Sequence, residues 1–289
     1  ACVNRALSGP ININNDHSDS MGIRDAGWIQ IYAENNQEAY DNFLQAMPIG
    51  ESPEVRLPVM ICQDGFITSH ALENIVLLDT DSVKQFVGEY HPEHYLLKEE
   101  NPLAVGPYDL GCHYMEHKVQ QAEAMKHAKA RILEVAKQFE ALTGRKYGLF
   151  EEYQMEDAEV AVLLIGSSAG TAKAAVDQLR KDGVKAGLIK IRVFRPFPVE
   201  ELAQALAHVK VLAILDKAES FSANGGPLFS EVRGALYDLE HRPRTVGYVY
   251  GLGGRDITPE HFKDIYARLT DIANGGELGP VYTHLGQRG

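Results

Sequence analysis

The chain has 289 residues, 45% of them hydrophobic and 24% charged, and its formal net charge at pH 7 is -12. This length favours two domains, and the composition is typical of a globular protein that fills a core. The acidic charge argues against nucleic acid as a partner, because phosphate backbones carry the same sign. The sequence also has no apolar run long enough to span a bilayer, so no membrane association is expected.

The N-terminus and the cysteines indicate where the protein works. The chain starts at Ala1 rather than Met and lacks a basic region followed by an apolar stretch, so we expect a trimmed chain and no signal peptide. Cys2, Cys62 and Cys112 lie far apart and form no CxxC, which argues against a disulfide framework, a zinc site or an iron–sulfur site. Three thiols in an acidic chain favour the reducing cytoplasm.

The first part of the chain, over residues 10–87, alternates between strand and helix patterns. In order, we predict a strand around 11–13, a turn-rich cluster over 14–20, a strand over 28–32, a helix over 36–47 and a short buried strand over 59–62. Residues 88–114 are rich in Pro, Gly, Tyr and His and show no period, which predicts a long linker. We therefore place a domain boundary after residue 114.

The second part opens with a long helix over residues 115–143, which Gly144 ends. Near-continuous apolar strands then alternate with amphipathic helices, which predicts a parallel sheet covered by helices on both faces. The strands are predicted at 160–165, 187–191, 209–215 and 245–250, and the helices at 170–182, 198–207, 226–240 and 259–273. The fold class is therefore α/β.

Two glycine-containing loops follow predicted strands. The loop 166–171, Gly-Ser-Ser-Ala-Gly-Thr, offers backbone amides but matches neither GxGxxG nor GxxxxGK[ST], so a tight turn is favoured over a phosphate site. The loop 251–256 carries Arg255, and a structural or interface role is favoured over an anion site. Arg192 and Arg195 at a strand end are interpreted as members of ion pairs at a surface or domain interface.

A second candidate site lies near the N-terminus. Arg5 precedes a turn that holds Asp16, His17 and Asp19. An arginine fork matches a substrate carboxylate, and a histidine can donate a hydrogen bond or relay a proton. From spacing alone a solvated loop and a surface arginine are the commoner alternative.

Several segments together resemble the pyruvate:ferredoxin oxidoreductase family, in the same order and over nearly the whole chain. They are Asn-Arg-Ala-Leu-Ser at 4–8, Asn-Asp-His-Ser-Asp-Ser-Met at 15–21, Arg-Asp-Ala-Gly-Trp-Ile-Gln at 24–30, Glu-Asn-Asn-Gln-Glu-Ala at 34–39, Asp-Gly-Phe-Ile-Thr-Ser-His at 64–70, Arg-Val-Phe-Arg-Pro-Phe-Pro at 192–198 and Gly-Tyr-Val-Tyr-Gly-Leu-Gly-Gly-Arg-Asp at 247–256. Among the family's members the chain looks like the alpha subunit of the multi-subunit form.

The resemblance implies an incomplete thiamine pyrimidine-binding-type domain with a linker over 1–114, then a transketolase C-terminal-like parallel α/β domain over 115–289. It implies that Arg5 binds the 2-oxoacid carboxylate. Asp16, His17 and Asp19 are then expected near the substrate pocket. The upstream glutamate that activates thiamine in the family has no counterpart here, nor has the Gly-Asp-Gly and Asn-Asn motif for diphosphate and Mg²⁺.

The implied activity is oxidative decarboxylation of a 2-oxoacid, first of all pyruvate, to an acyl-CoA, with electrons passed to ferredoxin. Thiamine diphosphate with Mg²⁺ is then largely held by the beta subunit, and 4Fe–4S clusters by the other subunits of gamma and delta type. Another oxoacid such as oxalate or 2-oxoglutarate remains an alternative substrate. A non-catalytic scaffold or assembly subunit, or a nucleotide-binding α/β module, is the alternative from another class.

Overall fold

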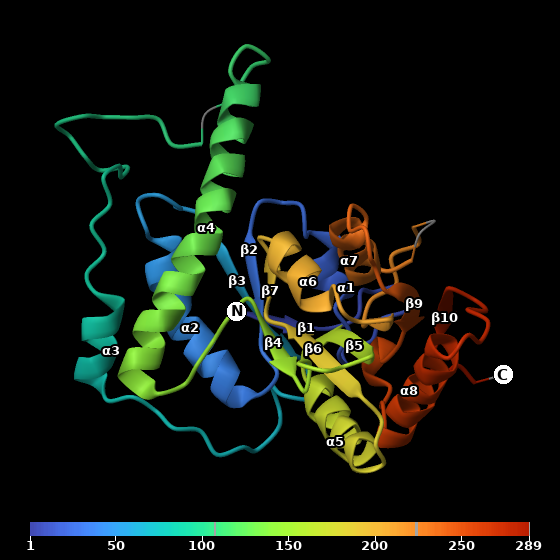
Figure 1. The fold of residues 1–289 in the computed structure, drawn as a ribbon. Helices are drawn as coiled ribbons and strands as arrows, with labels where there is room; N and C mark the ends of the chain where they lie inside the picture. The colour runs from blue at the N-terminus through green and yellow to red at the C-terminus, as the bar shows by residue number, and fades with distance from the viewer. Residues whose placement is uncertain (107, 223–224, 289) are drawn as a thin grey trace.

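The computed structural model describes residues 1–106, 108–222 and 225–288, and its strands form two sheets (Figure 1). The first sheet has the order β1-β3-β2-β7 and the second the order β10-β9-β8-β5-β6-β4. Within the described part of the chain, none of the helices combines the length and the apolar character needed to cross a bilayer.

The first sheet consists of β1 (Cys2–Asn4), β3 (Val59–Asp64), β2 (Ile29–Tyr32) and β7 (Val193–Arg195). The strands β1, β3 and β2 are parallel, and β7 joins β2 in the antiparallel direction. Two helices, α2 (Asn36–Gly50) and α4 (Tyr114–Thr143), share one apolar cluster with β2 and β3. A short α3 (Thr80–Val87) packs beside α2. Asn35 caps α2 by accepting a hydrogen bond from the Glu38 amide.

The second sheet consists of β10 (Tyr282–His284), β9 (Arg244–Val249), β8 (Val211–Asp216), β5 (Val160–Ile165), β6 (Ala186–Ile191) and β4 (Phe150–Tyr153). All neighbouring strands are parallel except β4 and β6. Helices α5 (Ser168–Lys181) and α8 (Pro259–Ala273) cover one face, and α6 (Val199–Leu206) and α7 (Pro227–Leu236) pack on the other. This confirms the predicted parallel α/β fold, whose central strands are buried and almost entirely apolar.

The two sheets share one apolar core. The cluster that includes Tyr32 and Cys62 of the first sheet also includes Leu163 and Ile189 of the second. The chain itself crosses between the sheets, because β6 belongs to the second and β7, which follows at once, belongs to the first. The sheets are therefore held together by covalent continuity as well as by burial.

One predicted strand is wrong, and several edge strands were not predicted. The segment around Ile11 and Ile13 forms no strand, and these side chains are 72% and 56% exposed. Alternating apolar and polar residues form a strand when the apolar side chains face a core. Here they lie on a surface loop, so no strand forms. The short strands β1, β4, β7 and β10 carry too little periodicity to be seen in the sequence.

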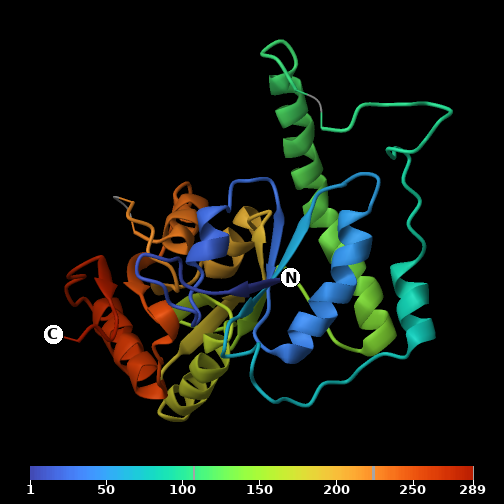
Figure 2. The ribbon, with the colours of Figure 1, turned by 180° about the vertical axis from the view of Figure 1, so that it is seen from behind.

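The helix α4 projects from the body at its N-terminal end, beside the long segment that precedes it (Figures 1 and 2). Its C-terminal half buries Ala128, Ile132 and Val135 against the first sheet. The predicted helix over 115–143 is confirmed, with Gly144 in the left-handed conformation at its end. The domain boundary after residue 114 stays a prediction. In the structure α4 packs on the first sheet, and β4 is the first strand along the chain that belongs to the second sheet.

Candidate functional site

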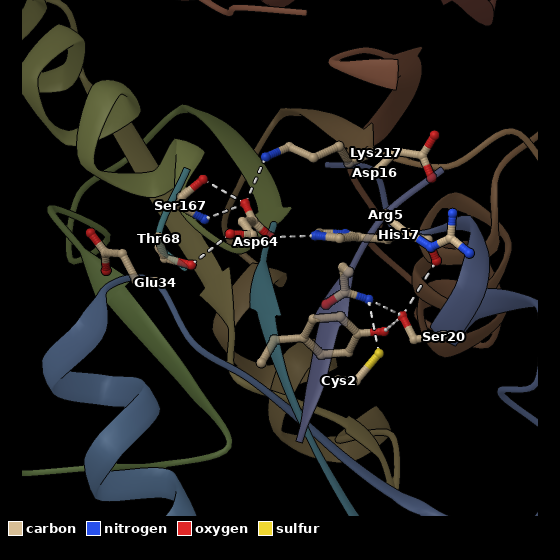
Figure 3. A network of polar contacts seen from close by, with 12 residues as sticks. Cys2, Arg5, Asp16, His17, Ser20, Glu34, Asp64, Thr68, Ser167 and Lys217 are labelled. Atoms are coloured by element: carbon tan, nitrogen blue, oxygen red, sulfur yellow. Dashed lines mark hydrogen bonds and ion pairs between the residues drawn. The ribbon is translucent and has the colours of Figure 1, made fainter. Parts of the chain in front are cut away.

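The carboxyl ends of parallel strands from both sheets meet at one buried aspartate. Asp64 ends β3, Ser167 lies in the turn between β5 and α5, and Lys217 follows β8. His17 reaches the same place from the loop before α1 (Ser18–Gly22). Figure 3 shows the side chains of these residues pointing toward the Asp64 carboxylate. Ligand sites of α/β sheets form at such strand ends.

Four hydrogen bonds hold Asp64. His17 Nε2 lies 2.8 Å from Oδ1, and Lys217 Nζ donates to Oδ2 at 2.8 Å. Ser167 donates to Oδ2 from its amide at 3.1 Å and from its hydroxyl at 2.5 Å. Burial opposes ionisation of the carboxyl, but Lys217 and His17 outweigh it and hold the pKa of Asp64 well below its usual range. The carboxylate therefore joins segments of both sheets as an anion.

Glycine at position 166 is required by this arrangement. Its φ is +83°, and a Cβ atom there would lie 2.9 Å from Asp64 Oδ1. The interpretation of the 166–171 loop as a tight turn agrees with this geometry, since Ser167 uses its amide to hold a carboxylate of this chain.

His17 is a buried positioning residue in this structure. It is 2% exposed, its ring lies 5.3 Å from that of Tyr32, and its amide donates to the Lys217 carbonyl at 2.7 Å. His17 Nε2 is hydrogen-bonded to Oδ1 of Asp64, the last residue of β3, so β3 sets the orientation of the imidazole ring. The loop that contains His17 is thus fixed to both sheets.

Asp16 and Asp19 have different surroundings. Asp16 is buried, accepts a hydrogen bond from the Ser18 amide at 2.9 Å, and lines a cavity. Asp19 accepts from Asn4 Nδ2 at 2.8 Å and from the Arg5 amide at 3.0 Å. Asp19 therefore ties the end of β1 to α1, and with it the backbone of Arg5.

Arg5 presents its side chain to solvent in this chain. Among the described residues its guanidinium makes no hydrogen bond or ion pair, and in Figure 3 it points away from Asp64. The structure therefore brings His17 and Asp19 into the network that holds this region, and leaves the Arg5 fork available to a ligand.

A cavity of about 470 Å³ adjoins this loop. Its walls comprise the segment 6–10, which directly follows Arg5, together with Asp16, Ser18, Met21, Gly22, Arg24, residues 219–221, Pro227 and Leu252. Beside Asp16 lies Asn15, which is fully buried, and neither polar atom of its side chain has a hydrogen-bond partner in the described structure. Buried amides without a partner are rare, so Asn15 stands out beside the cavity-lining Asp16.

The other arginine and glycine motifs have structural partners. Arg195 pairs with Asp25 at 2.9 Å and with Glu231 at 2.5 Å, as the ion-pair interpretation predicted. The ion-pair interpretation is wrong for Arg192, which forms no ion pair among the described residues: it is buried and donates to the neutral Asn42 Oδ1 at 2.8 Å, and burial lowers its pKa to about 10. The glycine loop meets the turn 12–15, because the Gly254 amide donates to the Asn15 carbonyl at 2.7 Å. These contacts support an interface role for both motifs.

A second buried ion cluster lies between the sheets, apart from the cavity. Lys190 of β6 donates to Glu34 at 2.7 Å, to Glu151 at 2.9 Å and to Glu38. Lys173 of α5 adds a second cation, 2.8 Å from Glu34. Burial opposes the charge of Lys190, but the glutamates outweigh it and raise its pKa. The three carboxylates are spaced as metal ligands would be, yet an ammonium sits among them.

Asp216, one residue before Lys217, carries a carboxyl that titrates near neutral pH. It accepts hydrogen bonds from the Leu228 and Phe229 amides at 2.8 and 3.0 Å, but burial raises its pKa to about 7. The folded chain therefore keeps a proton that the unfolded chain, with an ordinary pKa of 3.8, has released. We expect this carboxyl to make the free energy of unfolding fall as pH rises from about 4 to about 7.

Replacing Asp216 with Asn removes this contribution. The free energy of unfolding of the variant is therefore expected to depend less steeply on pH between about pH 4 and about pH 7. Urea unfolding of both proteins across the window measures the two slopes. Asp64 does not interfere, because its lowered pKa confines its own effect to more acid solutions. Equal slopes for the two proteins would contradict the assignment.

Sequence reasoning missed Lys217 and the roles of Asp64 and Ser167. Asp64 opens one of the segments that resemble the family and Ser167 lies in a glycine loop, but no local motif predicts their contact, since Ser167 and Lys217 lie 103 and 153 residues from Asp64. The one available signal is a charged pair, Asp-Lys at 216–217, at the end of an apolar strand. Such a pair at the carboxyl end of a parallel strand is typical of functional or junction sites.

Comparisons with known proteins agree with this architecture. A family model described as "Pyruvate flavodoxin/ferredoxin oxidoreductase, thiamine diP-bdg" matches residues 1–137, and one described as "Pyruvate:ferredoxin oxidoreductase core domain II" matches residues 158–262. A curated relative, "Pyruvate synthase subunit PorA" of Thermotoga maritima, is 49% identical over 99% of this chain and 72% of its own length. The protein of the same description from Methanocaldococcus jannaschii is 43% identical over 91% of this chain and 67% of its own length.

Two further comparisons bear on substrate and fold. "Ketoisovalerate oxidoreductase subunit VorA" of Pyrococcus horikoshii is 41% identical over 96% of this chain and 70% of its own length. A solved 2-oxoglutarate:ferredoxin oxidoreductase from Magnetococcus marinus, with 2-oxoglutarate, coenzyme A and succinyl-CoA bound, aligns with a TM-score of 0.58 at 14% identity. That alignment covers 93% of this chain and 47% of the solved chain, and it concerns the fold alone.

Proposed function

This chain belongs to the pyruvate:ferredoxin oxidoreductase family, and from that premise we propose that it is the alpha-type subunit of an enzyme that oxidatively decarboxylates a 2-oxoacid. Pyruvate is the first candidate substrate, because the relatives from Thermotoga and Methanocaldococcus are described as pyruvate synthase subunits. The acyl product passes to coenzyme A, and ferredoxin accepts the electrons. The sequence resemblance to the family is thereby confirmed.

The thiamine-binding family model covers β1, β2 and β3 of the first sheet, but the described residues do not fit the diphosphate and Mg²⁺. In the described ranges one group of three potential ligands meets the spacing for a metal, and the Lys190 ammonium lies within bonding distance of all three carboxylates. The charged residues that line the cavity near Arg5 are Asp16, Glu219 and a single cation, Arg24, a balance that does not favour a diphosphate. We therefore propose that a beta-type subunit holds the diphosphate and Mg²⁺, and that this chain supplies one wall.

The observation that carries the proposal is the state of Arg5. Its amide donates to Asp19, whereas its guanidinium has no partner among the described residues, and Arg5 directly precedes the cavity-lining segment 6–10 in the chain. A fixed backbone with a free fork suits bidentate recognition of a carboxylate. We propose that Arg5 binds the carboxylate of the oxoacid.

The loop residues position this arginine. Asp19 restrains the Arg5 backbone, and His17 anchors the loop through Asp64. Asp16 faces the cavity, and we propose that it limits how far an anionic substrate enters. In this assignment His17 relays no proton to the substrate, because it is only 2% exposed and is not among the residues that line the cavity.

Thiamine, when bound, serves as the electron sink that lets the oxoacid lose CO₂. Two electrons then leave singly, which requires iron–sulfur clusters, and a chain with 3 cysteines lacks the ligands for a four-cysteine cluster. We propose that 4Fe–4S clusters lie in gamma- and delta-type subunits. The chain's own part is to bind and orient the substrate.

The proposed contact of Arg5 recognises the carboxylate, a group that all 2-oxoacids share. It therefore does not distinguish pyruvate from the branched oxoacid named for the Pyrococcus relative, or from oxalate or 2-oxoglutarate. Selection among them is left to residues that meet the rest of the substrate, some of them on partner chains.

Replacing Arg5 with Ala in the assembled enzyme is expected to lower kcat/KM for pyruvate roughly tenfold to a hundredfold. This follows from the loss of a charge-assisted contact that contributes about 1.5–3 kcal/mol. Steady-state kinetics with reduction of ferredoxin or a viologen dye measures it. Arg5→Lys keeps the charge without the fork, so an intermediate loss is expected.

The matched control is Arg242→Ala, which removes another arginine whose hydrogen bond reaches only the Tyr237 carbonyl and which does not line this cavity. It should leave kcat/KM unchanged. Unchanged kinetics for Arg5→Ala in an intact complex would instead assign this chain a scaffold role.

A further inference from the structure

Two of the three cysteines are direct neighbours in the first sheet. Cys2 of β1 and Cys62 of β3 are paired residues in a parallel ladder. Paired residues on adjacent parallel strands point to the same face of the sheet, and Cys2 packs on the cluster that contains Cys62. Adjacent strands lie about 4.8 Å apart, within the roughly 4.4–6.8 Å that separates the Cα atoms of a disulfide. The pair thus has the spacing of a disulfide without any rearrangement of the strands.

The two thiols differ in access and in acidity. Cys2 is partly exposed, whereas Cys62 is fully buried. The hydrogen-bonding Cys62 thiol lowers the pKa of Cys2 against the opposing effects of burial and of Asp19. Burial, reinforced by Cys2, raises the pKa of Cys62 well above its usual value. Since the thiolate is the reactive form, Cys2 is the group that an external oxidant meets first.

We propose that Cys2 and Cys62 form a reversible redox site that closes to an intrachain disulfide upon reaction with a small aliphatic disulfide. The Cys2 thiol loses its proton, and its sulfur attacks the oxidant, forming a mixed disulfide and releasing one thiolate, which takes up a proton. The Cys62 thiol then loses its proton and attacks the Cys2 sulfur, which breaks the mixed disulfide and releases the second thiol. Two protein thiols are oxidised, and one small disulfide is reduced to two thiols.

The site is connected to the segment around Arg5. Cys2 Sγ donates to Asp19 Oδ2 at 3.7 Å, and the same oxygen accepts from the Arg5 amide at 3.0 Å. Figure 3 shows Cys2 on the side of the network that contains Ser20. Closing the disulfide removes the thiol donor from Asp19 and bonds β1 covalently to β3. The redox state of the pair therefore changes the hydrogen bonding of Asp19, which holds the Arg5 backbone. This connection does not depend on which ligand Arg5 binds.

The test is a redox titration of the assembled enzyme in mixtures of oxidised and reduced glutathione, followed by acid quenching, alkylation and tryptic mass mapping. We expect the peptide that ends at Arg5 to be linked to the peptide over residues 57–84. Its yield should rise at least about tenfold from reduced to oxidised mixtures and vanish after dithiothreitol. Because the readout is a peptide mass, it does not depend on the proposed role of Arg5 or on retained activity.

Variants separate the expected bridge from other thiol reactions. Cys112 is the exposed third cysteine, and Cys112→Ser should form the bridge as the unmodified chain does. Cys2→Ser should give no linked peptide, and Cys62→Ala should retain one glutathione on Cys2. Should Cys62→Ala fail to fold, the unmodified chain still decides. A Cys2 that remains unmodified, or that holds glutathione without ever forming the bridge, would overturn the proposal.

Discussion

Replacing Asp64 with Ala is expected to lower the free energy of unfolding by about 3–5 kcal/mol, because it leaves the buried Lys217 ammonium without its counter-ion. Lys217 and His17 are both buried and both contact this carboxylate, and Ser167 loses the acceptor of two hydrogen bonds. Urea or thermal unfolding of the purified chain measures the loss. Because the network joins both sheets, the loss should appear as one cooperative transition at lower denaturant concentration.

Two comparison variants make the Asp64 experiment specific. Asp238→Ala, at an exposed position, should change stability by no more than about 0.5 kcal/mol. The double variant Asp64→Asn with Lys217→Met, which removes both charges, should recover part of the loss. A loss below about 1 kcal/mol for Asp64→Ala would show that water replaces the carboxylate and that the network does not hold the sheets together.

The same carboxylate sets the acid limit of stability. Its folded pKa is lowered from an unfolded value of 3.8, so its contribution is present above that pH and is lost as the pH falls below it. The slope has the opposite sign to that of Asp216, whose pKa is raised to about 7. Together, the two carboxyls therefore contribute most to stability in acid solution near pH 4, where their two pH windows meet.

Replacing Lys190 with Met is expected to cost about 3–5 kcal/mol as well, because three glutamates then face one another with Lys173 as their remaining cation. The carboxylate oxygens of Glu34, Glu38 and Glu151 lie within 4.8 Å of one another. Divalent cations with oxygen ligands suit this spacing. Added Ca²⁺ or Mn²⁺ should therefore raise the melting temperature of the variant.

The unmodified chain should show no such response, since its own ammonium lies among the carboxylates. Differential scanning calorimetry at several cation concentrations distinguishes the two proteins. Lys210→Ala removes an exposed lysine that pairs with Glu159 and is the matched control for loss of a charge. A variant as stable as the unmodified chain, or one that cations do not stabilise, would contradict a caged ammonium.

Much of the second sheet could be predicted from local pattern. Its central strands are almost entirely apolar, with Lys190 and Asp216 as the charged exceptions, and the helices between them carry one apolar face each. A start signal such as Thr258 and Pro259 marks the N-terminus of α8 within the chain itself. These features depend on contacts within a few residues or on burial, which hydrophobicity encodes directly.

The candidate site was predicted in part. Arg5, Asp16, His17 and Asp19 were singled out by spacing and by resemblance, and the structure brings two of them into one network with β1 and β3. Their roles stay proposals. The partner of His17, however, lies 47 residues away, and that of Lys217 lies 153 residues away. Neither pairing has a local signature.

The sequence by itself determined the α/β class, the succession of buried strands along the chain and the family, because each is encoded in periodicity or in short segments kept in order. The tertiary structure alone decided that Asp64 joins the two sheets, that Lys190 pairs with three glutamates and that Cys2 lies beside Cys62. Such pairings depend on strand order and register, which bring distant residues within bonding distance. A buried charge is stable only when its partner is also in place, so these pairs form only in the completed fold.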